Sequence, residues 1–165
     1  MEAQASRVAQ LISLVVPFYN ESAVIADFFR EVPKVLASIK HADYEIVCVN
    51  DGSKDDTLAR LCGAARLDPR IKIVDLSRNF GKEAAMTAGI DIAVGDAVVP
   101  FDADLQDPPE LIPELVRKWR EGFDVVIARR AERNSDTFSK RLTAALFYRF
   151  HNAIADVKIP ENAGD

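Results

Sequence analysis

The chain has 165 residues, of which 48% are hydrophobic and 28% are charged, and its formal net charge is -5 at pH 7. This length and this balance are typical of one domain with a sizeable hydrophobic core. The acidic balance excludes the broad basic surface expected of a nucleic-acid-binding protein, and no apolar run approaches the roughly 20 residues needed to cross a bilayer.

Apolar, β-branched runs alternate with helical patterns along the chain. The predicted strands cover residues 11–16, 44–49, 71–76, 97–101 and 124–128, and the predicted helices cover residues 23–39, 55–66, 82–94 and 110–120. This order, with strands that are apolar on both faces, indicates a mostly parallel sheet covered by helices on both sides. We therefore expect an α/β fold, arranged as a three-layer sandwich, in a single domain over residues 1–165.

Both cysteines are predicted to be buried thiols. Cys48 lies in an apolar strand run, and Cys62 lies in a helical pattern. Two such cysteines support neither a disulfide framework nor a metal cluster, and they fit a reducing compartment.

Each predicted strand runs into a polar segment. In chain order these segments are 17–21, 50–57, 77–82, 102–107 and 129–130. Open parallel sheets bind ligands at the carboxyl ends of their strands. A crevice lined by these segments would hold acids, amides and bases together, as a charged nucleotide requires.

The segment after the second strand has two interpretations. Asn50-Asp51-Gly52-Ser53 is a good turn sequence, and Asp55 or Asp56 is a plausible helix cap, so these residues can be purely structural. Their position at a strand end equally suits a ligand-binding edge.

Gly81 and Lys82 follow the third strand, where they open the next predicted helix. The helix dipole mildly disfavours a lysine at this end. A nearby phosphate would offset that cost, so we interpret Lys82 as a candidate phosphate ligand.

Asp102, Asp104 and Gln106 follow the fourth strand. Two carboxylates spaced i, i+2 at a strand end can point to the same side, and two unpaired anions there would repel each other. Such a pair suits a hard divalent cation that keeps open positions for the phosphate oxygens of a substrate. The pattern alone is weak, because turns are rich in aspartate.

The acids that come next have a structural interpretation instead. Asp107 is predicted to cap the following helix, with Pro108 at its first position and Glu110 as the capping-box acid. These residues are therefore left out of the predicted cation site.

The C-terminal part of the chain is basic and amphipathic. Arg129 and Arg130 follow the fifth predicted strand and are either ligands or solvated surface residues. Residues 137–157 carry an apolar stripe preceded by Lys140 and Arg141, which suits either an anionic membrane surface or packing on the sheet. Residues 159–165 read as a loop that has just begun, so we expect a truncated chain.

Taken in order, four motifs resemble the inverting glycosyltransferases of family 2, which have the GT-A fold. Within that family the chain is most similar to the polyprenyl-phosphate sugar transferases, meaning dolichol-phosphate mannose synthase and the bacterial undecaprenyl-phosphate glucosyltransferases. The resemblance covers nearly the whole chain. The motifs are Val16-Pro17-Phe18-Tyr19-Asn20-Glu21, Val49-Asn50-Asp51-Gly52-Ser53, Leu76-Ser77-Arg78-Asn79-Phe80-Gly81-Lys82 and Asp102-Ala103-Asp104-Leu105-Gln106-Asp107-Pro108-Pro109.

The resemblance implies roles for residues of the first two motifs. Pro17, Tyr19 and Glu21, together with Asp51, would hold the base and the ribose of a nucleotide sugar. These residues lie at the ends of the first two predicted strands, so the implied nucleotide site coincides with the predicted crevice.

The resemblance also implies a metal site and an acceptor site. Asp102, Asp104 and Gln106 would be the protein ligands of Mg²⁺ or Mn²⁺. Arg130 would contact the phosphate of the acceptor. Asp165 would lie near the reaction centre, where it either acts as a base or orients the acceptor.

The implied reaction moves a hexose, by resemblance from UDP-glucose, to a polyprenyl phosphate. A phosphate acceptor is already ionised near neutral pH, so it needs positioning by Arg130 or Arg133 more than it needs a strong base. Lys140 and Arg141 would help to engage the lipid phosphate. The family usually adds C-terminal membrane helices, so we expect a soluble fragment of a protein that works at the cytoplasmic side of the membrane.

Three alternatives remain open. A related transferase would glycosylate a saccharide or a protein, and a fragment could bind a nucleotide sugar without turnover. A receiver-type signalling domain has a similar layout. It needs an acid pair directly after the first strand, however, where this chain has Pro17-Phe18-Tyr19-Asn20-Glu21.

Overall fold

A parallel sheet in the order β3-β2-β1-β4 is the centre of the fold in the part of the chain that the structure describes. The structure is a computed structural model, and it describes residues 10–128. Its elements are β1 (Gln10–Phe18), α1 (Ile25–Ala37), β2 (Ala42–Asn50), α2 (Thr57–Leu67), β3 (Ile71–Asp75), α3 (Lys82–Ile92), β4 (Ala97–Pro100), a 3₁₀ turn (Pro109–Leu111) and α4 (Ile112–Arg120). The predicted α/β fold with a parallel sheet is confirmed.

The register of the strands brings their carboxyl ends to one edge of the sheet. Phe18 of β1 is paired with Asn50 of β2, and Asn50 is paired with Asp75 of β3. On the other side of β1, Val15 is paired with Pro100 at the end of β4. The polar segments that follow these strands therefore start from neighbouring positions.

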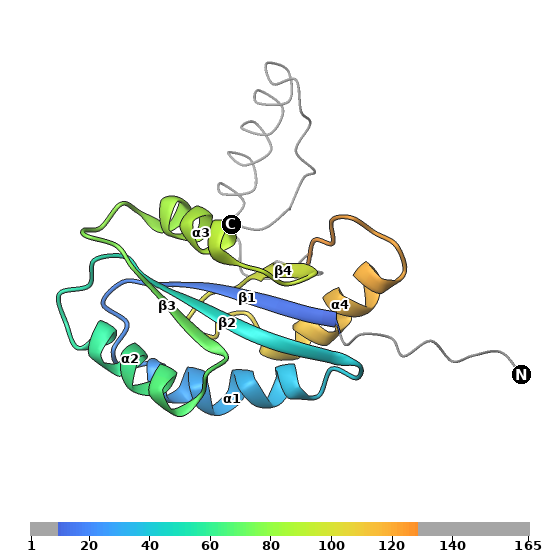
Figure 1. Ribbon diagram of the computed structural model, residues 1–165, viewed down its shortest axis with the longest axis horizontal. Helices are drawn as coiled ribbons and strands as arrows, with labels where there is room; N and C mark the ends of the chain where they lie inside the picture. Colours follow the sequence, from blue (N-terminus) through green and yellow to red (C-terminus); the bar gives the residue numbers. More distant parts are fainter. Residues whose placement is uncertain (1–9, 129–165) are drawn as a thin grey trace, which may run out of the picture. The chain divides into compact units, whose positions relative to one another are not determined.

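Two hydrophobic cores pack against the two faces of the sheet. Figure 1 shows α1 and α2 on one side of the sheet and α3 on the other. In α1, Phe28, Val32 and Leu36 recur at helical spacing and are buried against one face, because that spacing places them on one stripe of the helix. On the opposite face, α3 contributes the buried Ala85 to a smaller cluster with Val15, Val47 and Val49.

Helix α3 approaches the sheet closely because it presents a glycine there. A Cβ atom at Gly89 would lie 2.4 Å from Cγ1 of Val15 and 2.8 Å from Cγ2 of Val49. The first turn of α3, which carries Lys82, is thereby fixed relative to the ends of the strands.

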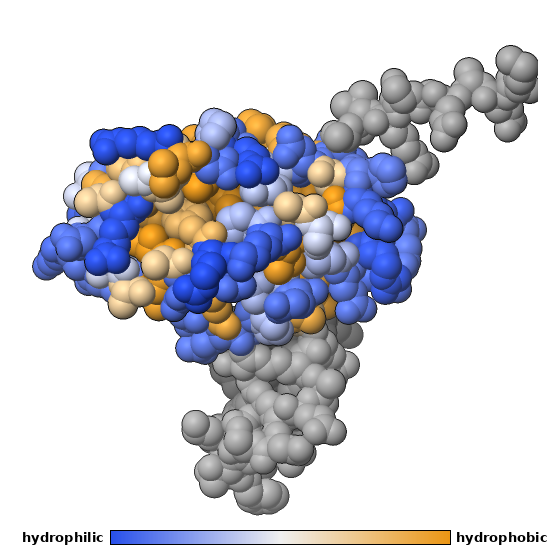
Figure 2. Space-filling view, turned by 90° about the horizontal axis from the view of Figure 1, so that it is seen from below, coloured by the Kyte–Doolittle hydropathy of each residue, from blue (hydrophilic) through white to orange (hydrophobic). Residues whose placement is uncertain are grey.

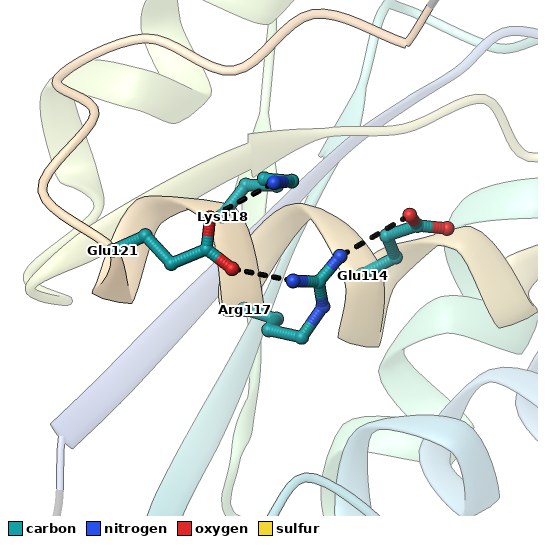
Figure 3. A network of polar contacts seen from close by, with 4 residues as sticks. All are labelled: Glu114, Arg117, Lys118 and Glu121. Atoms are coloured by element: carbon teal, nitrogen blue, oxygen red, sulfur yellow. Dashed lines mark hydrogen bonds and ion pairs between the residues drawn. The ribbon is translucent and has the colours of Figure 1, made fainter.

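Helix α4 covers part of the larger core and exposes a charged face. Ile112 and Val116 are buried, and Trp119 packs against the same core at intermediate exposure. On the outer face, Arg117 pairs with Glu114 at 3.5 Å and with Glu121, and Lys118 pairs with Glu121 at 2.8 Å (Figure 3). Such exposed pairs contribute little to stability, because water screens them.

The start of this helical segment differs from the prediction. The 3₁₀ turn begins at Pro109 rather than at Pro108, its cap residue is Pro108, and no side chain makes a cap hydrogen bond there. The α-helix itself begins only at Ile112. Consecutive prolines at 108 and 109 explain the shift, because Pro109 disfavours the helical conformation of the residue before it. The predicted helix start, with Asp107 as the cap and Pro108 as the first helical residue, is therefore wrong by one residue.

The fifth predicted strand is also wrong. Within 122–128 the structure has no regular strand. Val125 and Ile127 are 76% and 59% exposed. An apolar, extended run becomes a strand only where a neighbour supplies backbone partners, and the described residues supply none here.

Polar and apolar residues share the surface of the described part of the chain, and one of its two thiols is buried. Seen from below, from the side of α1 and α2, polar and apolar residues are interspersed (Figure 2). Cys48 is buried, and its burial raises the pKa of its thiol, whereas Cys62 is only half-buried, contrary to expectation. Among the helices of residues 10–128, none is long and apolar enough to span a membrane.

Candidate functional site

A pocket lies at the carboxyl edge of the sheet. It has a volume of about 260 Å³, which is close to the lower end of the roughly 300–1,000 Å³ of small-molecule sites. Segments that follow all four strands contribute to its wall. The lining residues are Pro17, Phe18, Tyr19, Glu21, Asp51, Asn79, Gly81, Lys82, Asp102, Ala103 and Asp104.

The pocket brings together most of the site residues that the sequence predicts. Pro17, Tyr19, Glu21, Asp51, Lys82, Asp102 and Asp104 all line it, although they come from four separate segments of the chain. Gln106 is exposed and is not among the lining residues. The predicted residues Arg130, Arg133, Lys140, Arg141 and Asp165 lie outside the described residues.

The loop after β1 and the loop after β2 are joined by hydrogen bonds. The backbone N–H of Asn20 donates to Oγ of Ser53 at 3.0 Å, and the N–H of Lys54 donates back to Oδ1 of Asn20 at 2.8 Å. The N–H of Glu21 donates to Oγ1 of the fully buried Thr57 at 2.9 Å. Asn20 has a positive φ of 55°, a conformation that asparagine tolerates better than most residues. These contacts fix the backbone that carries Tyr19 and Glu21.

Asp55 completes this junction between the two loops. Its carboxylate accepts hydrogen bonds from the N–H of Thr57 at 3.0 Å and from the N–H of Ser22 at 3.2 Å. Hydrogen bonds from Thr57, and then from Ser22, lower the pKa of Asp55. The predicted position of the helix cap is correct, because Asp56 is the cap residue of α2. Its side chain, however, makes no cap hydrogen bond.

Asp51 holds the loop that leads into α3. Its two carboxylate oxygens accept the N–H groups of Phe80 at 2.7 Å and of Gly81 at 2.9 Å, and Asp51 is only 2% exposed. The pocket wall formed by Asn79, Gly81 and Lys82 therefore depends on this buried acid. The sequence suggested a choice between a turn and a ligand-binding edge, and the structure gives Asp51 a loop-holding role within the pocket.

Gly52 allows this loop to approach. A Cβ atom at Gly52 would lie 2.3 Å from the carbonyl carbon of Arg78 and 2.5 Å from the nitrogen of Asn79, and the glycine has a φ of 63°. Only glycine fits a left-handed position so close to another backbone. Neither this contact nor the pocket position of Asn79 was predicted, although Gly52 and Asn79 lie in the motifs that resemble family 2.

Lys82 forms an ion pair across the pocket. Its Nζ atom lies 2.8 Å from Oδ1 and 2.9 Å from Oδ2 of Asp102. The hydrogen bond with Asp102 raises the pKa of Lys82, and the side chains of both residues remain about half exposed, at 55% and 40%. Lys82 thus faces a carboxylate in this structure, at the place where the sequence suggested a phosphate.

Three consecutive residues after β4, Asp102, Ala103 and Asp104, line the pocket. Ala103 is buried, Asp102 is half-exposed and Asp104 is exposed. Asp104 accepts the N–H of Gln106 at 3.1 Å, across Leu105, which has a positive φ of 57°. Both predicted acids thus line the same pocket, and Asp104 also accepts a hydrogen bond within its own turn.

The acids make this side of the pocket electronegative. Burial raises the pKa of Glu21, and the negative charges of Asp104, Asp55 and Asp102 raise it further. Within residues 10–128 no three acids, histidines or cysteines are grouped closely enough to hold a metal by themselves. Two carboxylates do fit a hard divalent cation that takes its other ligands from a bound phosphate and from water.

Comparison with known proteins agrees with this geometry. The family model described as Glycosyl transferase family 2 matches residues 13–165. An uncharacterized glycosyltransferase of Synechocystis is 53% identical over 93% of this chain and 48% of its own length. The bactoprenol glucosyl transferase of Shigella phage SfV is 49% identical over 93% of this chain and 50% of its own length. The chain thus spans about half the length of these curated relatives.

Solved structures share the fold. A mannosyltransferase from Pyrobaculum calidifontis, in complex with GDP-Man and Mn²⁺, has a TM-score of 0.59 at 25% identity and covers 72% of this chain and 35% of its own. Glucosyl-3-phosphoglycerate synthase from Mycobacterium tuberculosis, with Mn²⁺, UDP and product, has a TM-score of 0.61 at 25% identity and covers 88% and 53%. The GT-A fold is therefore confirmed, and the chain belongs to glycosyl transferase family 2.

Proposed function

We propose that this chain transfers a hexose from a nucleotide-diphosphate sugar, with UDP-glucose as the donor, to a polyprenyl phosphate, with inversion at the anomeric carbon. The observation that carries the proposal is the convergence of Asp102, Asp104, Lys82 and Glu21 on one pocket at the carboxyl edge of the sheet. The name of the Shigella phage relative supports a glucosyl donor and a polyprenyl acceptor.

The donor is proposed to bind with its diphosphate between the acid pair and α3. Lys82 is the first residue of α3, and a helix N-terminus and an ammonium group both stabilise phosphate. Pro17, Tyr19 and Asp51 line the part of the pocket that we assign to the base and the ribose. The negative charge of Glu21 suits hydrogen bonds from ribose hydroxyl groups.

The proposed cation site consists of Asp102 and Asp104, with Gln106 as a further oxygen donor. Carboxylate and amide oxygens suit Mg²⁺ or Mn²⁺. When bound, such a cation would neutralise the charge that develops on the departing diphosphate. The Mn²⁺ in the two solved relatives supports this assignment.

The transfer itself needs little proton chemistry from the protein. An oxygen of the acceptor phosphate forms a bond to the anomeric carbon, and the bond from that carbon to the diphosphate breaks, with the electron pair leaving on UDP. We propose that Arg130 and Arg133 position the acceptor phosphate, that Lys140 and Arg141 engage it at the cytoplasmic face of a membrane, and that Asp165 orients it. These five residues lie outside the described part of the chain.

Calorimetry tests the donor and the cation together. UDP, GDP and their sugars are titrated into the chain with Mn²⁺ present or chelated. We expect one nucleotide to bind more tightly with Mn²⁺, and Asp104→Asn to abolish the difference. Equal affinity with and without Mn²⁺ would contradict the proposed cation site, and no affinity for any nucleotide would contradict the donor assignment.

The acceptor is tested separately by product analysis. The chain is incubated with labelled donor and with undecaprenyl phosphate, a soluble saccharide or a protein extract. We expect label in the lipid fraction. Label in the saccharide or the protein instead would favour the related transferases considered from the sequence.

A further inference from the structure

In this structure the ammonium group of Lys82 lies against Asp102, one of the two acids of the proposed cation site. Nζ of Lys82 contacts both carboxylate oxygens of Asp102, at 2.8 Å and 2.9 Å. Asp102 thus directs both of its oxygens at an ammonium group that comes from a different segment of the chain. Asp104 instead accepts the backbone N–H of Gln106.

This contact conflicts with a divalent cation on Asp102. A cation bonded to an Asp102 oxygen at about 2.1 Å would lie within roughly 5 Å of the ammonium group as the structure has it. The two positive charges would repel each other unless Lys82 moved or an anion came between them. Lys82 and the cation therefore compete for the carboxylate of Asp102, which does not bind both well at the same time.

The surroundings allow Lys82 to leave. The pair is half-exposed, and exposed ion pairs are easily exchanged because they contribute little net stability. Lys82 is the first residue of α3, where a phosphate would be bound by the ammonium group and the N-terminal end of the helix together. An entering diphosphate would thus supply the anion that both positive charges need.

We propose that Lys82 is an ion-exchange residue, which holds the place of the cation on Asp102 and transfers to the diphosphate when the nucleotide binds. This inference rests on the proposed function of the pocket and deepens it. Cation binding without nucleotide is weak because Lys82 competes for Asp102. Nucleotide and cation then strengthen each other's binding by the same factor, as linkage requires.

Mn²⁺ binding without nucleotide tests the competition directly. Free and bound Mn²⁺ are measured by electron paramagnetic resonance for the wild-type chain, Lys82→Met and Lys82→Arg. We expect Lys82→Met to bind Mn²⁺ at least about fivefold more tightly, the low end of typical coupling factors. Lys82→Arg keeps the charge and should bind Mn²⁺ as weakly as the wild type. Lys34→Met, which removes an exposed lysine of α1, controls for the change in net charge.

The same titrations with UDP present test the exchange. In the wild type, we expect UDP to strengthen Mn²⁺ binding by a larger factor than in Lys82→Met, because the variant no longer has a competitor to remove. Equal Mn²⁺ affinity of wild type and Lys82→Met without UDP would overturn the inference while leaving the proposed function intact. Tighter Mn²⁺ binding by Lys82→Met, together with no response to UDP in either protein, would support competition at Asp102 and overturn the nucleotide assignment and the exchange.

Discussion

Gly52 is the position where the smallest substitution should have the largest effect on the pocket. In Gly52→Ala the new Cβ atom would lie 2.3 Å from the carbonyl carbon of Arg78, against an ordinary contact near 3.4 Å. The obstacle is backbone, so it cannot rotate away, and the 78–81 loop must retreat by about 1 Å. That shift would stretch the hydrogen bonds at 2.7 Å and 2.9 Å by which Asp51 holds Phe80 and Gly81.

The expected cost follows from these contacts. Hydrogen bonds to a charged group contribute about 1.5–3 kcal/mol each, and a non-glycine residue in the left-handed region costs about 1–2 kcal/mol. With partial relaxation, we expect the free energy of unfolding to fall by about 3 kcal/mol. The affinity for UDP should fall about tenfold, as for the loss of about 1.4 kcal/mol of polar contact.

Urea unfolding and calorimetry with UDP measure the two effects. Gly63→Ala is the matched control, because a Cβ atom at Gly63 in α2 has nothing within 4 Å and should stabilise the helix by about 0.5–1 kcal/mol. Wild-type stability and wild-type UDP affinity in Gly52→Ala would refute the argument that the two loops meet at this glycine.

Two further predictions concern buried acids. Asp51→Asn presents an amide group to two backbone donors in place of a carboxylate, so the free energy of unfolding in urea should fall by about 1–3 kcal/mol; an unchanged value would show that the loop does not need this acid. Burial raises the pKa of Glu45, but hydrogen bonds from Lys72, the Ser13 hydroxyl and the Val94 N–H outweigh it and leave that pKa lowered. Because the folded-state pKa lies below the unfolded value of roughly 4.3, this stabilisation is present above that pH and is lost as the pH falls through the folded-state pKa. Urea unfolding between pH 3 and pH 7 should show a weaker acid-side loss in Glu45→Gln, and parallel curves would contradict it.

The fold could be predicted because its signals are local and repeated. Apolar runs at 11–16 and 44–49 are buried on both faces of β1 and β2, and the stripe of α1 is visible in the spacing of Phe28, Val32 and Leu36. The run 124–128 has the same composition but has no strand partner among the described residues. A strand forms only where a neighbouring strand is available to pair with it, so the composition of 124–128 alone gave a wrong prediction.

The membership of the pocket could be predicted, but its internal contacts could not. Strand order and a family resemblance were enough to gather Glu21, Asp51, Lys82 and Asp102 at one edge. That Asp102 faces Lys82, and that Asp51 faces the backbone of Phe80 rather than open solvent, depends on loop conformations that no periodicity encodes. Turn-rich sequences such as 50–57 permit several such conformations.

The hydrogen bonds between the loops after β1 and β2 affect how the preferred nucleotide of the pocket could be changed by exchanging loops. Asn20 is hydrogen-bonded to Ser53 and to Lys54, and the Thr57 hydroxyl accepts the backbone N–H of Glu21. A graft that imports only one of these loops from a homologue would leave its hydrogen-bonding groups without complementary partners. Exchanging 19–22 and 53–57 together would keep the hydrogen bonds between the two loops. Nucleotide preference should therefore change when both loops are exchanged and should resist the exchange of one loop alone.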